Sequence, residues 1–175
     1  MVRAGFLAGF LCLMVFSCSR KSCPPENIDL QSISLGKVPY KGYDSLVFIK
    51  STDTTRDTFH FKSQLPGSIT VLDYKNESSC RVEIRKEVKE YKFYHPGSSL
   101  MMRLSLAAGI PDDSLHIYFA SKHFSISAKD IGESDTANVF IHNNSKDSSV
   151  AKYLTSKGIV GFRLKNPTET WQRIY

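Results

Sequence analysis

A period of two governs the sequence between positions 100 and 106 of this 175-residue chain. The even positions are large and apolar, namely Leu100, Met102, Leu104 and Leu106. Successive side chains of a β-strand point to opposite faces, so this spacing predicts a strand with one buried face.

Shorter apolar runs of the same kind recur between turn residues from Val38 to the C-terminus. The predicted strands lie at 46–49, 59–61, 69–74, 82–84, 88–93, 115–119, 124–126, 139–141, 159–164 and 170–174. The breaks between them include Asp53 to Arg56, Pro66-Gly67, Asn76 to Ser79, His95-Pro96-Gly97 and Ile110-Pro111. This spacing predicts an all-β antiparallel meander that closes to a barrel or packs as a sandwich. In residues 148–158 a helical spacing competes with the strand pattern.

The first residues of the chain resemble a bacterial lipoprotein signal. Arg3 precedes an apolar stretch that is too short to span a bilayer and has the length of a signal-peptide core. The stretch ends in Val15-Phe16-Ser17-Cys18, which resembles the lipobox cut by signal peptidase II. The resemblance implies a signal peptide at 1–17 and lipidation of Cys18, whose two or three acyl chains, palmitate among them, would anchor stably. An ordinary secretory signal and an uncleaved anchor remain the alternatives.

Residues 18–37 are predicted to form a lipidated flexible tether ahead of a β domain at 38–175. The prolines Pro24-Pro25 favour an extended spacer. Lys and Arg outnumber Asp and Glu by 23 to 17, a formal charge of +6. The cations are interleaved with glutamates between Arg81 and Lys92, the pattern of a solvated face, so no nucleic-acid partner is expected.

Two of the four cysteines are left for a disulfide after export. Cys12 would leave with the signal and Cys18 would carry lipid, so Cys23 and Cys80 remain in an oxidising compartment. They form a candidate bridge from tether to domain, and two free thiols are the alternative. The cysteine spacing does not suggest zinc.

The sequence offers no recognisable catalytic motif. It lacks a G-x-S-x-G elbow, a Walker loop and a G-x-G-x-x-G turn. Its histidines show no metal-ligand spacing and are interpreted as scattered surface residues: His60, His95, His116, His123 and His142. Asp112-Asp113 is assigned to a turn and Trp171 to the core. We therefore expect a chain that is not an enzyme and uses no metal and no cofactor.

Both ends of the β region resemble small lipoproteins of Bacteroidota-type bacteria. The stretches are "YKGYDSLVFIKSTDTTRDTFHF" and "AKYLTSKGIVGFRLKNPTETWQRIY". The resemblance favours a strand over 150–155. Four Asp-Ser or Asp-Thr pairs also resemble O-glycosylation acceptors of such bacteria, which makes Ser45, Thr54, Ser114 and Thr136 candidate sites. Ordinary turn chemistry is the alternative interpretation.

These features predict a lipid-anchored protein of the cell envelope, held at the outer membrane. Lipoproteins of Bacteroidota-type bacteria that are exported to the cell surface carry acidic residues after the lipidated cysteine. The segment Ser19-Arg20-Lys21-Ser22 has none, so a periplasm-facing position is expected. The predicted function is a non-enzymatic protein-interaction or structural module with an envelope partner. The alternative is a binder of a small apolar ligand or lipid in a lipocalin-like cavity.

Overall fold

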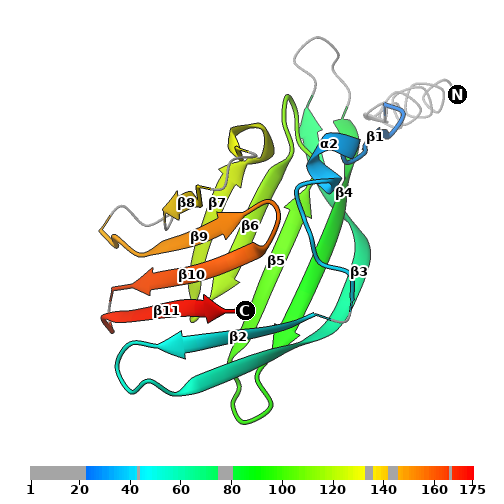
Figure 1. The fold of residues 1–175 in the computed structure, drawn as a ribbon. Coiled ribbons are helices and arrows are strands. Elements are labelled where there is room, and N and C mark those ends of the chain that lie inside the picture. The colour runs from blue at the N-terminus through cyan, green and yellow to red at the C-terminus, as the bar shows by residue number, and fades with distance from the viewer. Residues whose placement is uncertain (1–22, 43, 75–80, 133–135, 142–145, 166) are drawn as a thin grey trace, which may run out of the picture.

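The computed structural model describes residues 23–42, 44–74, 81–132, 136–141, 146–165 and 167–175. This described part is almost entirely antiparallel β-structure (Figure 1). Its strands are β1 (Glu26–Ile28), β2 (Ser45–Lys50), β3 (Arg56–Tyr74), β4 (Arg81–Tyr94), β5 (Met101–Ala107), β6 (Ser114–Phe119), β7 (Lys122–Ser127), β8 (Asn138–Ile141), β9 (Val150–Leu154), β10 (Gly158–Leu164) and β11 (Glu169–Ile174). A short helix, α2 (Ser32–Leu35), and a 3-10 turn, η1 (Ala128–Asp130), complete it. Neither is long and apolar enough to cross a membrane, and the same holds for every helix in these ranges.

The sheet is an up-and-down meander that nearly closes into a barrel. Its order is β7-β6-β5-β4-β3-β2-β11-β10-β9-β8, so the last strand pairs with β2, as in Val47 opposite Ile174. The two ends of this path, β7 and β8, approach each other without a hydrogen-bonded ladder. A salt bridge from Lys122 to Asp147 spans this seam and holds the pKa of Asp147 well below its usual range. The predicted all-β antiparallel fold is confirmed, in its barrel form.

Aromatic side chains fill the barrel interior. Phe48, Phe59, Phe119 and Phe162 have at most 2% of their surface exposed. The rings of Phe119 and Phe162 stack with centroids 4.3 Å apart, and Trp171 meets Phe119 edge-on at 5.3 Å. Burial of each such side chain contributes about 1.5–3 kcal/mol. The alternation predicted at 100–106 is also confirmed, because Met102, Leu104 and Leu106 are buried.

Strand β3 runs through Pro66-Gly67, where the sequence predicts a break. Strand β2 pairs with β3 only at residues 56–60, whereas β4 pairs with it out to Tyr74. At Pro66, β3 is therefore hydrogen-bonded to β4 but not to β2. Proline is tolerated at such an edge because its missing N–H can point away from the paired strand. The strand preferred over 150–155 is confirmed as β9.

The segment before β2 is packed onto one end of the barrel. Strand β1 pairs in parallel with β4, with Glu26 opposite Ile84. Leu30, Val38 and Tyr40 are buried in the core. The folded part of the chain thus includes residues 26–37, which the sequence assigns to the tether. Leu30 belongs to the core and Ile28 and Leu35 pack against it, which stabilises this segment on the barrel, whereas Ile33 is exposed.

Candidate functional site

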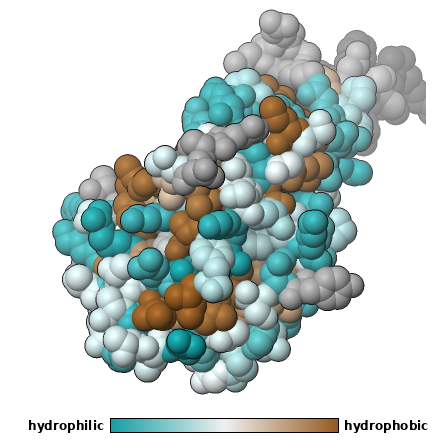
Figure 2. Space-filling view, in the orientation of Figure 1, coloured by the Kyte–Doolittle hydropathy of each residue, from teal (hydrophilic) through white to brown (hydrophobic). Residues whose placement is uncertain are grey.

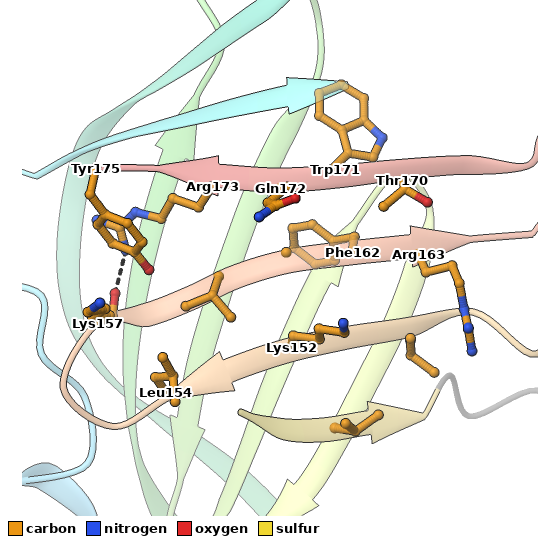
Figure 3. A pocket seen from close by; sticks show the side chains of 14 residues that line it. Lys152, Leu154, Lys157, Phe162, Arg163, Thr170, Trp171, Gln172, Arg173 and Tyr175 are labelled. Carbon is orange, nitrogen blue, oxygen red and sulfur yellow. Dashed lines mark hydrogen bonds between the residues drawn. The ribbon is translucent and has the colours of Figure 1, made fainter. Parts of the chain in front are cut away.

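A groove with a volume of about 450 Å³ lies on the outer face of β9, β10 and β11 (Figure 3). Alternation along the strands places its lining. Phe162 and Trp171 point into the barrel, so Arg163 and Gln172 beside them point outward. Lys152 faces outward from β9 in the same way. The groove is therefore a feature of the wall and does not open into the core.

A β-bulge shapes the middle of the groove. The register of β10 against β9 shifts between Ile159 and Gly161, which leaves Val160 as the extra residue. Gly161 is needed there because a Cβ would lie 2.7 Å from the backbone oxygen of Trp171. Val160, at the bulge, is one of the residues that line the groove.

The groove is lined by cations. Lys152, Lys157, Arg163 and Arg173 contribute to it, and no Asp or Glu side chain is found among the described residues that line it. Arg173 donates a hydrogen bond to the backbone oxygen of Lys157, drawn as a dashed line in Figure 3. The charged groups of Lys157 and Arg173 lie 4.5 Å and 4.9 Å from the ring centroid of Tyr175. Burial raises the pKa of the Tyr175 phenol, which keeps it neutral. This end of the groove is thus basic and aromatic.

Exposed aliphatic residues adjoin the groove at β8. Val139 is 52% exposed and lines the groove, and Ile141, on the same face, is 65% exposed. Figure 2 shows apolar surface over β8 and over β11 and β2, with hydrophilic surface between. Exposed apolar patches next to polar ones are typical of interaction surfaces.

A second pocket, of about 540 Å³, lies at the barrel end that is remote from α2. Lys50, Glu169 and Trp171 line it together with loop residues. Lys50 forms a salt bridge with Glu169 at 2.8 Å, and that hydrogen bond raises the pKa of Lys50. The Trp171 indole donates to Glu169 at 3.2 Å. Trp171 is 5% exposed, which confirms its predicted place in the core.

Two histidines that the sequence analysis treats as scattered lie side by side. The Nδ1 atom of His116 is 3.1 Å from Nε2 of His123. Tyr118 stacks on His123 with centroids 4.4 Å apart, and Arg103 lies over Tyr118. Burial is the main cause that lowers the pKa of His116. Within the described ranges, no group of three side chains suited to a metal is found.

Sequence reasoning missed this pair because it considered spacing along the chain. The tight turn at Ala120 and Ser121, both at positive φ, sets Tyr118 directly opposite His123. A two-residue turn with such φ values is the typical hairpin connection. Recognising the hairpin would have placed His116 and His123 on one face, one diagonal step apart.

The structure describes only some of the other predicted site residues. Cys18, Cys80 and His142 fall outside the described residues, whereas Cys23 is disulfide-bonded. The candidate glycosylation residues are on separate elements: Ser45 opens β2, Thr54 is in an exposed turn, Ser114 opens β6 and Thr136 is exposed before β8. Thr54 has a φ of 55° and its hydroxyl donates to the Asp53 carbonyl at 2.7 Å.

Asp113 has a structural role that the sequence did not indicate. Only 1% of its surface is exposed. Its carboxylate accepts the backbone N–H of Gln31 at 2.8 Å and that of Gly109 at 3.3 Å. It therefore fastens the amino-terminal segment to the β5–β6 turn.

Comparisons of this chain with protein-family models, with curated proteins and with solved structures gave no match.

Proposed function

We propose that this chain is a lipid-anchored protein of the cell envelope, held at the outer membrane through Cys18, that binds a protein partner without catalysing a reaction. The groove on the outer wall of β9–β11 is the observation that carries the proposal. It combines cations with an aliphatic border, while the barrel interior is occupied by the chain's own aromatic side chains. The resemblance of residues 15–18 to a lipobox supports the anchor.

The chemistry of the groove fits an extended segment rich in acidic and aliphatic residues. Lys152, Arg163 and Arg173 offer positive charge along neighbouring strands. Complementary charge speeds encounter and fixes the orientation of a partner, whereas apolar contacts supply most of the affinity. Val139, Ile141 and Val160 provide such contacts beside the cations.

The second candidate is a binder of a small apolar ligand, and the nearly closed barrel favours it. A lipocalin-like binder needs space inside the sheet. Here Phe119 and Phe162 stack at 4.3 Å in that space, and Phe59, Phe48 and Trp171 surround them. A ligand could enter only by displacing these rings, so the wall groove is the better-supported site.

The groove can be tested with a short synthetic peptide of alternating glutamate and valine, labelled for fluorescence anisotropy. The double variant Lys152→Glu/Arg163→Glu should weaken its binding roughly tenfold or more, about 1.4 kcal/mol. The control is Lys62→Glu/Lys92→Glu, which makes the same change of net charge on β3 and β4. Equal losses in both variants would show that net charge alone attracts the peptide and would contradict the groove.

The same preparations distinguish the second candidate. A fluorescent fatty acid should show no saturable binding to the wild-type protein. Saturable binding that survives Lys152→Glu/Arg163→Glu and quenches the fluorescence of Trp171 would favour an internal cavity instead.

The anchor has a separate test. Cys18→Ala should abolish incorporation of labelled palmitate and leave the precursor uncut, because the thiol that accepts the diacylglyceryl group is gone. Labelling that persists in this variant would contradict the lipoprotein assignment. Cys23→Ala is the matched control, and it should be labelled like the wild-type protein.

A further inference from the structure

We infer that one end of the barrel rests on the lipid bilayer that holds the anchor, with a group of exposed aliphatic side chains inserted at the bilayer surface. This inference rests on the proposed lipidation of Cys18. We call this region the α2 end, and define it as β1, α2, the turn at 109–112 and residues 69–71 of β3. The occupant of this surface is the bilayer itself.

Chain length limits how far this end can be from the membrane. Cys18 precedes the disulfide-bonded Cys23 by five residues, and an extended chain spans at most about 3.6 Å per residue, or roughly 18 Å here. Strand β1 follows at once, and its pairing with residues 84–86 of β4 fixes it to the barrel. The end that carries β1 must therefore lie close to the lipid headgroups.

The parts of the α2 end are held together by specific contacts. Residues 69–71 of β3 and residues 26–28 of β1 pair with the same stretch of β4, one on each side. The backbone N–H of Ala108 donates to the backbone oxygen of Glu87 in β4 at 2.8 Å. This hydrogen bond holds the start of the β5–β6 turn beside β4. Gln31 reaches Asp113 at the other side of that turn. Figure 1 shows α2, β1 and this turn at one end of the molecule.

This end exposes large aliphatic side chains. Ile110 is 73% exposed, Ile33 63%, Ile69 53% and Val71 41%. They belong to three elements that the contacts above bring to one end. Burial of aliphatic groups at a bilayer interface is favourable, so a bilayer held nearby by the anchor would cover them. Figure 2 shows apolar surface at this end as well.

The orientation also leaves the groove accessible. The groove runs over the wall strands β9–β11, whereas the α2 end is bounded by β1, α2 and the β5–β6 turn. With the α2 end on the bilayer, a partner in the aqueous compartment can reach the wall from the side.

A depth measurement tests the inference on the mature lipidated protein in vesicles of phosphatidylcholine and phosphatidylglycerol. The variant Ile110→Cys and its matched control Val139→Cys are each labelled with an environment-sensitive fluorophore, which can reach both positions because both replaced residues are exposed. Labelling is done without reductant, so that the disulfide of Cys23 stays intact. Lipids with a bromine atom on the upper acyl chain act as the quencher. The label at 110 should be quenched at least roughly twofold more than the label at 139. Adding Ile33→Asp/Ile69→Asp should bring the value at 110 toward that at 139, whereas adding Ile141→Asp should leave it unchanged.

Flotation of the vesicles separates the two ways in which the inference can fail. A protein that floats with the vesicles while both labels are quenched equally would overturn the orientation and leave the anchor intact. A protein that does not float, and from which palmitate is absent, would overturn the anchor and this inference with it.

Discussion

The two ends of the barrel are closed in different ways. At the α2 end the chain before β2 lies over the opening, and Leu30, Val38 and Tyr40 are buried there. The opposite end is bounded by the turns that join successive strands, and a pocket of about 540 Å³ lies between them. We call this second region the turn end.

The contacts at the two ends differ in how deeply they are buried. At the α2 end, Lys37 Nζ donates to the backbone oxygens of Ala128 and Ile131 at 2.9 Å and 2.8 Å, and the Tyr153 hydroxyl donates to the backbone oxygen of Lys37 at 2.7 Å. At the turn end the Asp53 carboxylate accepts from Thr55 in an exposed turn, and Lys50 and Glu169 form a partly exposed ion pair. Changes at the α2 end should therefore affect the whole fold, and most changes at the turn end should stay local.

Trp171 is the expected exception at the turn end, because it is a core residue that lines the pocket there. Trp171→Ala should lower the free energy of unfolding by about 3–5 kcal/mol, the usual cost of truncating a large core side chain. Urea denaturation measures this, and the wild-type indole should be blue-shifted and shielded from iodide. An indole freely quenched in the folded protein would contradict the burial of Trp171. It would also mean that substitutions anywhere at the turn end have only local effects on stability.

A pair of glycine substitutions compares the two ends directly. Gly158 has a φ of 76°, and a Cβ there would overlap the buried phenol of Tyr40. Gly158→Val should cost about 2–5 kcal/mol, because it combines a left-handed backbone with overpacking. Gly97→Ala, at the turn end, meets only the His95 ring at 3.4 Å. It should change the stability by less than about 0.5 kcal/mol. Similar values for both would remove the contrast.

Buried and exposed lysines extend the comparison. Lys37→Met should lower the free energy of unfolding by about 1–3 kcal/mol, because two backbone oxygens at the α2 end lose their buried donor. Lys50→Met breaks an accessible ion pair with Glu169 at the turn end and should have a smaller effect. Thermal and urea unfolding of both variants check the order. A larger loss for Lys50→Met would reverse it.

The smallest effect is expected on the wall between the two ends, where His116 lies. Burial lowers its pKa from the ordinary value of 6.5, so the folded protein binds fewer protons than the unfolded chain. Its contribution to stability is therefore fully present above about pH 6.5 and is lost as the pH falls toward the lower folded-state pKa. His116→Gln should lose less melting temperature than the wild-type protein between about pH 7.5 and about pH 5.5. Parallel curves for the two proteins would contradict this account.

The local sequence pattern predicted most of the strands, but it could not predict which strands pair or which residues form contacts between strands. Alternation located β5, and the spacing of turns located β6, β7, β8, β10 and β11, because both are properties of neighbouring residues. The strand β9 is favoured over a helix only by the resemblance of the C-terminal stretch. Pro66 led to a wrong prediction of a break in β3. A proline fits there because β3 pairs with only one strand at that point, and this depends on the arrangement of the whole sheet. The packing of residues 26–37 depends on acceptors far along the chain, such as Asp113 for Gln31. The groove and the histidine pair likewise depend on register between strands.

The pairing of β2 with β11 determines when one edge of β2 can be covered during synthesis or export of the chain. A chain that emerges amino-terminus first, from a ribosome or a translocation channel, presents β2 long before its partner exists. Until then one edge of β2, which carries Val47 and Phe48, has no neighbouring strand, and such edges are prone to pair with other chains. Ile174, the partner of Val47, follows it by 127 residues (174 − 47). The nascent protein therefore depends on shielding of this edge until β11 has been released, and a chain without β11 would leave the edge open.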